Sequence, residues 1–253
     1  MFIVLASFSY GQNFECDLYK FHLGTGFGKY NEDRLRDSIW LYYYLQGEPV
    51  DKRSRIKYKV FYEEDTVRHI EAFHENGKLL CDISFVNGKR NGEVIFFRRN
   101  GSISMISNYK YGLLDGDVRL FYQSGRLEKK VQFKEGLLHG DCTGYYDNKS
   151  STLRAKGTFV SGIGDGEYVF YTPTGASIKE YFIKGKPAKN QVSLDKYGKL
   201  EHEIVWCEFE GAYVKSISYD EDGEVKDQFD IPYDESNNYI VYGGFVVLNS
   251  NCY

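Results

Sequence analysis

The chain has 253 residues and carries 32 Lys and Arg against 36 Asp and Glu, so its formal net charge is −4. This weakly negative balance argues against a general nucleic-acid binder, because such proteins need a surplus of Lys and Arg to displace counterions. The apolar content of 42% is too high for a wholly disordered chain. No apolar run approaches the roughly 18 residues of a membrane-spanning helix, so no transmembrane span is predicted.

Within these bounds the composition is unusually aromatic. The sequence contains 23 Tyr, 18 Phe and 26 Gly, but only 4 Pro and 2 Met. Aromatic side chains fit the pleated surface of a sheet, and glycine supplies the positive φ angles of tight turns. The composition therefore predicts an all-β protein rich in hairpins.

Residues 1–11 are predicted to be the remnant of a secretory signal peptide. The run from Phe2 to Phe8 is apolar, and Ser9 and Gly11 are small residues two positions apart, as a signal peptidase site requires. The alternative is an N-terminal β-strand. The signal interpretation predicts an extracytoplasmic protein (periplasmic, secreted or envelope-associated) whose mature chain begins near Gln12.

The cysteines are dispersed and odd in number. They are Cys16, Cys81, Cys142, Cys207 and Cys252, and none forms a Cys-x-x-Cys pair. This spacing argues against a zinc site. One or two disulfides are compatible with it, and a bond between Cys16 and Cys252 would tie the two ends together, although sequence does not fix connectivity.

Residues 12–66 are predicted to form an N-terminal segment with one degenerate repeat. In that repeat ten residues separate Asp37 from the turn residue Gly47, as they do in the clearer copies downstream. A basic stripe follows, because alternate residues of one strand share a face. The stripe consists of Arg53, Arg55, Lys57 and Lys59. It either contacts an acidic partner or anionic lipid, or protects an edge strand against aggregation.

Residues 67–230 are predicted to form a repeat array. Segments 85–92, 109–116, 133–140 and 159–166 share the template aromatic-x-x-Gly-x-x-x-Gly, and a fifth copy at 182–185 keeps only the first Gly. The first glycines are 24, 24, 26 and 23 residues apart. Two strands of about 6–8 residues and two turns use up this length, so the sequence predicts about six or seven hairpin repeats.

The glycines of these turns are predicted to serve backbone conformation. They are Gly77, Gly88, Gly92, Gly101, Gly112, Gly116, Gly125, Gly136, Gly140, Gly162, Gly166, Gly175 and Gly185.

Side-chain alternation assigns two faces to the strand after each second Gly. The second and fourth residues after that Gly should line a buried face, as for Val94 with Phe96 and Val118 with Leu120. The fifth residue should lie on the other face, beside acidic residues, and form an exposed aromatic binding surface. This fifth position holds Tyr43, Phe97, Phe121, Tyr145 and Tyr171.

Residues 231–253 are predicted to form a C-terminal capping hairpin. Two short apolar segments, 239–242 and 245–248, flank Gly243 and Gly244. A Gly-Gly pair between apolar segments is typical of a two-residue hairpin turn, and an apolar hairpin of this kind suits a cap on a repeat array.

The Gly-x-x-x-Gly turn, the paired aromatics and the following Asn-Gly turn resemble the MORN-variant repeat (membrane occupation and recognition nexus) of bacterial proteins. The resemblance covers residues 67–200 well and the flanking segments poorly. It implies an elongated, twisted antiparallel β-meander, and some bacterial members carry an antitoxin or immunity label.

No residue pattern in the sequence suggests catalysis, a cofactor or a metal ion. The acidic segment 220–224 lacks the remaining ligand spacing of a calcium loop, and the five histidines are dispersed. We therefore expect a non-catalytic binding or scaffold protein that contacts an unknown protein partner through its aromatic face. The alternatives are an antitoxin or immunity protein, an envelope protein that binds membrane surfaces or glycans, and a cryptic hydrolase. The oligomeric state stays open.

Overall fold

In the computed structural model every described element is a β-strand, and no helix occurs in the described ranges 27–43, 56–187, 191–207, 213–232, 239–242 and 245–248. The all-β prediction is confirmed. The predicted signal remnant at 1–11, Cys16, Cys252, Arg53 and Arg55 lie outside these ranges. Cys81 and Cys142 are buried. In the described ranges no helix is long and apolar enough to cross a membrane.

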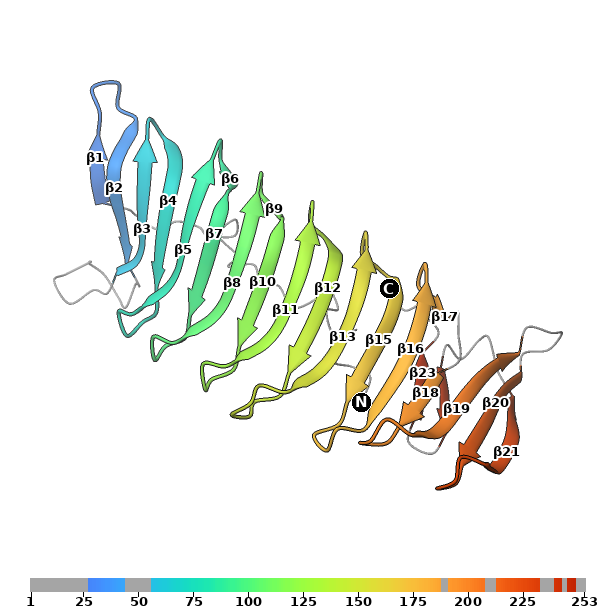
Figure 1. Cartoon of the computed structure of the whole chain (residues 1–253). Helices are drawn as coiled ribbons and strands as arrows, with labels where there is room; N and C mark the ends of the chain where they lie inside the picture. The colour runs from blue at the N-terminus through green and yellow to red at the C-terminus, as the bar shows by residue number, and fades with distance from the viewer. Residues whose placement is uncertain are drawn as a thin grey trace. The chain divides into compact units, whose positions relative to one another are not determined.

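The chain divides into two compact units, with the boundary after Leu137. In the first unit the longer strands pair antiparallel in chain order, in a meander of hairpins, and the two-residue strands β6 and β9 pair with β5 and β8 (Figure 1). Its strands are β1 (Phe27–Tyr30), β2 (Arg36–Tyr43), β3 (Ile56–Glu63), β4 (Thr66–Phe73), β5 (Leu79–Val86), β6 (Lys89–Arg90), β7 (Gly92–Phe97), β8 (Ile103–Lys110), β9 (Leu113–Leu114), β10 (Gly116–Phe121) and β11 (Leu127–Lys134).

The second unit repeats this meander. Its strands are β12 (Leu137–Tyr145), β13 (Leu153–Val160), β14 (Ile163–Gly164), β15 (Gly166–Tyr171), β16 (Ser177–Ile183), β17 (Lys186–Pro187), β18 (Gln191–Leu194), β19 (Leu200–Cys207), β20 (Tyr213–Tyr219) and β21 (Val225–Pro232). The strands β22 (Tyr239–Tyr242) and β23 (Phe245–Leu248) pair with each other in a separate sheet, at the positions expected for the C-terminal hairpin. Its capping role stays a prediction.

The first Gly of each template copy lies in a two-residue turn with positive φ at both central residues. In one such turn Tyr111 has φ 51° and Gly112 has φ 89°. Two positive φ angles define the type I′ turn, whose twist matches that of the flanking strands. The other turns of this kind are Asn87-Gly88, Glu135-Gly136, Ser161-Gly162 and Lys184-Gly185. All the glycines assigned to turns from the sequence have positive φ.

The second Gly of the template lies directly opposite an aromatic residue of the next strand. Gly92 faces Tyr109, Gly116 faces Phe133, and Gly166 faces Phe182. A Cβ at Gly92 or Gly166 would meet no atom within 4 Å, whereas both glycines have positive φ angles of 93° and 96°. Backbone conformation, and not space for the opposed ring, therefore accounts for the glycine that ends the template.

Candidate functional site

The core of the first unit is a row of residues that runs across its strands on one face, which we call the buried face. The row passes from strand to strand through directly paired positions, and its members are at most 8% exposed. They are Trp40, Val60, Ile70, Ile83, Val94, Ser107, Val118 and Val131. All but Ser107 are apolar, as expected for an ordinary hydrophobic core.

The equivalent row of the second unit changes character part-way along. It begins with Cys142, Gly157 and Tyr168, but Tyr168 pairs with Glu180, and the row continues through Gln191 to Ile204 and Ser216. Gln191 and Ser216 are buried, at 5% and 0% exposure. Polar groups in such positions cost stability unless their hydrogen bonds are satisfied, so this stretch is the strongest candidate for a functional site.

Glu180 and Gln191 form the centre of this candidate site. The Nε2 amide of Gln191 donates a hydrogen bond to Oε1 of Glu180. The Oε1 atom of Gln191 is buried and has no hydrogen-bond partner among the residues that the structure describes. Burial raises the pKa of the Glu180 carboxyl to about 7, and the bond from Gln191 opposes this shift only in part. The pair is therefore a poorly solvated acid beside an unsatisfied carbonyl.

Tyr168 bounds the site on the β15 side and is itself fully engaged. Its hydroxyl donates to the Thr158 carbonyl at 2.6 Å, and its ring packs edge-on against Phe182 with centroids 5.1 Å apart. A Cβ on Gly157 would lie 2.5 Å from the Tyr168 ring, so only glycine accommodates the ring there. Burial raises the pKa of Tyr168, so its hydroxyl stays protonated.

His202 and Ser216 lie further along the same face. The Nε2 atom of His202 is 2.7 Å from the Ser216 hydroxyl, and burial lowers the pKa of His202. His202 is therefore uncharged near neutral pH and does not neutralise a carboxylate.

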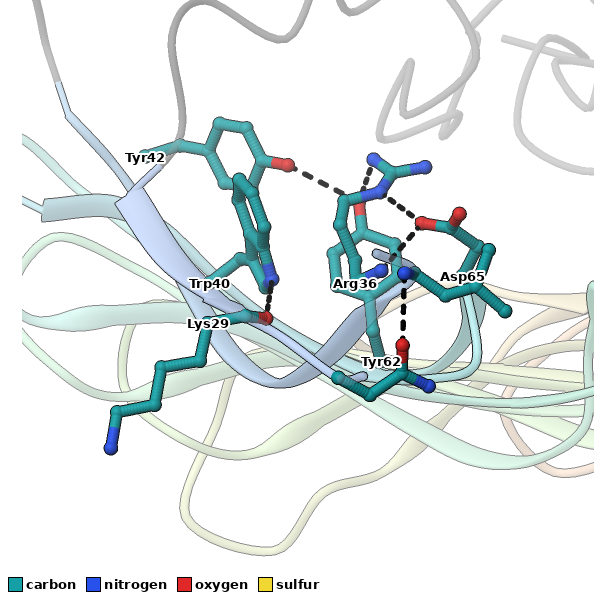
Figure 2. A network of polar contacts seen from close by, with 8 residues as sticks. Lys29, Arg36, Trp40, Tyr42, Tyr62 and Asp65 are labelled. Atoms are coloured by element: carbon teal, nitrogen blue, oxygen red, sulfur yellow. Dashed lines mark hydrogen bonds and ion pairs between the residues drawn. The ribbon is translucent and has the colours of Figure 1, made fainter. Parts of the chain in front are cut away.

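A second polar network lies at the N-terminal end of the first unit (Figure 2). Arg36 Nε donates to Asp65 Oδ1 at 2.6 Å, and an Arg36 terminal nitrogen donates to the Tyr62 hydroxyl at 3.0 Å. The Tyr62 and Tyr42 hydroxyls lie 3.2 Å apart, and Trp40 Nε1 donates to the Lys29 carbonyl at 3.2 Å. These groups bond to one another, so the network fastens β1, β2 and the β3–β4 turn together and leaves little to offer a ligand.

The residues predicted to form an exposed aromatic surface are only partly exposed. Tyr43, Phe97, Phe121, Tyr145 and Tyr171 all have intermediate burial. Leu120, which was expected to be much more buried than its neighbour Phe121, falls in the same intermediate range. The fully buried position is the second residue after the Gly, as at Val94 and Val118.

A side-chain bond links successive copies beside these aromatics. His74 Nε2 donates to the Phe97 carbonyl at 2.9 Å, Arg98 donates to the Phe121 carbonyl, and the Tyr146 hydroxyl donates to the Tyr171 carbonyl at 2.7 Å. His74, Arg98 and Tyr146 thus each anchor the next copy. The sequence gives little sign of it, because the three donors are different residue types.

The basic stripe lies in a central strand where the structure describes it. Lys57 and Lys59 belong to β3, which pairs with both β2 and β4, so the edge-strand interpretation of the stripe is wrong. The preceding β2 strand covers that edge. Lys59 makes an ion pair with Glu71 at 3.0 Å. Asp117, one of the acidic residues that follow the glycines, is also paired, because it lies 2.9 Å from Lys130.

Each type I′ turn is tied to the one before it. The Gly112 N–H donates to the Arg90 carbonyl and the Gly136 N–H to the Leu114 carbonyl, each at 2.8 Å. A side chain reinforces this link, because Asp115 accepts from the Glu135 N–H at 3.2 Å and His139 from the Ser161 N–H at 3.4 Å. His139 thus has a structural role in its turn.

Aliphatic side chains are exposed beside these turns. Leu113 and Ile163 are each 51% exposed, so about half of each side chain lies outside the core. We call the whole set the turn aliphatics. Its members are Val86, Leu113 and Leu137 in the first unit and Val160, Ile163 and Ile183 in the second.

The type I′ turns and the opposed glycines recur along the chain at a spacing of 23–26 residues. Residues 114–135 match the family described as MORN repeat variant. This match supports a MORN-repeat protein. No curated protein matches it. Because the neighbouring hairpins share the register of the matched MORN segment, the same structural unit extends on both sides of it. MORN repeats fit a binding or scaffold role.

Sequence reasoning missed Glu180, although a signal was present. The position five residues before the first Gly of each copy holds Ile83, Ser107, Val131, Gly157 and Glu180. Only the last of these is charged. This inward-facing position is uncharged in four copies and acidic in one, so the sequence alone distinguishes Glu180 from its equivalents in the other copies. In the described part of the chain no cluster of three or more His, Cys, Asp or Glu residues could hold a metal ion.

Proposed function

We propose that this MORN-repeat protein is a non-catalytic scaffold that binds a protein partner. The turn aliphatics carry this proposal. In each unit they lie directly before or directly after a type I′ turn, and their exposed surface is not part of the core. A repeated set of exposed apolar side chains is typical of an interaction surface.

Two of the turn aliphatics pair across the strands with a lysine. Lys89 pairs with Val86, and Lys110 pairs with Leu113, across their two-residue turns. Each such pair offers one aliphatic contact and one positive charge. The partner surface that fits it is apolar with acidic residues around it, since complementary charge favours encounter and register.

The aromatic residues of the fifth position are a second contact candidate in this proposal. Phe97, Phe121 and Tyr171 keep part of their surface exposed. Aromatic side chains are frequent among the residues that dominate binding energies, so they remain candidates for direct contact with the partner.

The test is a quantitative pull-down from an extract of the native host with the purified chain as bait. Leu113→Asp combined with Ile163→Asp places charges on the turn aliphatics of both units. We expect the captured partner to decrease by about tenfold or more, as for the loss of a binding hot spot. Tyr197→Asp is the matched control, because Tyr197 is 82% exposed but lies in a turn outside the set. Equal capture by both variants would refute the proposal.

A further inference from the structure

Glu180 and Gln191 together lack a partner that their chemistry calls for. Within the described ranges the carboxylate receives one hydrogen bond, from Gln191, and the Gln191 carbonyl receives none. A buried carbonyl without a donor costs about 1–3 kcal/mol, so such atoms are rare in folded proteins. Both unsatisfied groups are acceptors, and a ligand for them must be a donor.

No positive charge from the described ranges reaches this carboxylate. Two described titratable side chains share this face: Tyr168 pairs directly across from Glu180, and His202 lies two residues from Ile204, the partner of Gln191. Neither is positive near neutral pH, because burial raises the pKa of Tyr168 and lowers that of His202. Lys179 lies one residue away and therefore points to the opposite face.

A carboxylate with no counter-charge among the described residues, beside an unsatisfied carbonyl, matches one class of ligand. We propose that Glu180 and Gln191 bind the ammonium or guanidinium group of a Lys or Arg side chain that a protein partner presents. This inference rests on the proposed scaffold function and specifies one anchor of the partner. Glu180 is partly exposed and accepts the cation directly. The terminal torsion of Gln191 is broad, so its carbonyl can turn toward the bound cation.

A divalent metal fits this site less well. Calcium requires six to eight oxygen ligands and zinc commonly takes four protein ligands, whereas the pair supplies two carboxylate oxygens and one amide oxygen. An ammonium group has three donors, which this number of acceptors satisfies.

The test uses short blocked peptides Ac-Gly-Lys-Gly-NH2 and Ac-Gly-Arg-Gly-NH2, with Ac-Gly-Gln-Gly-NH2 as the neutral control. Binding is followed through the ¹³C resonance of the Glu180 carboxyl in glutamate-labelled full-length chain. We expect a saturable shift with the Lys and Arg peptides only. Because the ionised carboxyl is required and its pKa is about 7, binding should be about 30-fold tighter at about pH 8 than at about pH 5.5.

Glu180→Gln should abolish peptide binding, while Glu201→Gln, at an exposed carboxyl of the neighbouring β19 strand, should leave it unchanged. No shift with either cationic peptide would overturn the inference.

The host pull-down separates this inference from the proposed function. If Leu113→Asp with Ile163→Asp loses the partner while Glu180→Gln retains it fully, the scaffold function stands and the cation site is wrong. The scaffold function itself fails if the double variant Leu113→Asp with Ile163→Asp captures every protein as well as the wild-type chain does.

Discussion

Replacing Glu180 with glutamine should change how the stability of the protein depends on pH. Burial raises the pKa of the Glu180 carboxyl from 4.5 to about 7. The folded chain therefore holds a proton that the unfolded chain has already released between these two values. Stability is highest below the unfolded pKa and decreases as pH rises, until the folded carboxyl also ionises.

The size of the effect follows from the two pKa values. Between about pH 5 and about pH 8, the difference in proton binding lowers the free energy of unfolding by about 2.5 kcal/mol. Glutamine has the shape of the protonated acid and does not titrate. The Glu180→Gln variant should thus lose this part of the pH dependence and be more stable than the wild type at about pH 8, by an amount on the order of 2–3 kcal/mol.

Urea unfolding of both chains at the two pH values measures this difference, because every other titrating group is common to both. Glu201→Gln serves as the control, and its pH dependence should match that of the wild type. A Glu180→Gln variant that keeps the wild-type pH dependence would show that the carboxyl is well solvated. That result would refute the argument from burial.

Three further predictions concern packing and processing. Leu120→Ala and Phe121→Ala should lower the free energy of unfolding by similar amounts, about 1–3 kcal/mol each, because both residues are partly buried. A much larger loss for Leu120→Ala in thermal unfolding would instead favour a buried Leu120 face and an exposed Phe121 face. Gly157→Ala should cost about 1–3 kcal/mol through overpacking against the Tyr168 ring, and a neutral result in urea unfolding would show that the ring can move aside. N-terminal sequencing of the native protein should find a chain that begins near Gln12, and an intact Met1 in the cytosolic fraction would contradict the signal peptide.

The local hairpin structure could be predicted from the sequence because its causes are local. Tyr111-Gly112 and the other copies place glycine where a type I′ turn requires positive φ, and each second Gly faces a ring, as Gly116 faces Phe133. These requirements repeat every 23–26 residues, so five imperfect copies together indicate the hairpin unit. Strand alternation also placed Val94 and Val118 correctly on the buried face.

How much of each side chain is buried depends on the neighbouring strands, and not only on which face of the strand it occupies. Alternation gives the face of Phe121 but not how much of its ring the adjacent copies cover, and the structure leaves it only partly exposed. The basic residue Lys59 could not be placed at an edge or in the centre of a sheet until the pairing of β3 with β2 and β4 was known.

The candidate site depends on tertiary structure for the same reason. Glu180 and Gln191 are eleven residues apart, and neither is unusual for a strand of a soluble protein. Only the register of β16 and β18 brings the carboxyl and the amide together within a row that is otherwise largely apolar. The sequence by itself determines the turns and the alternation of each strand, because these follow from backbone conformation within a few residues. Which polar groups lose their water is decided by pairing between strands.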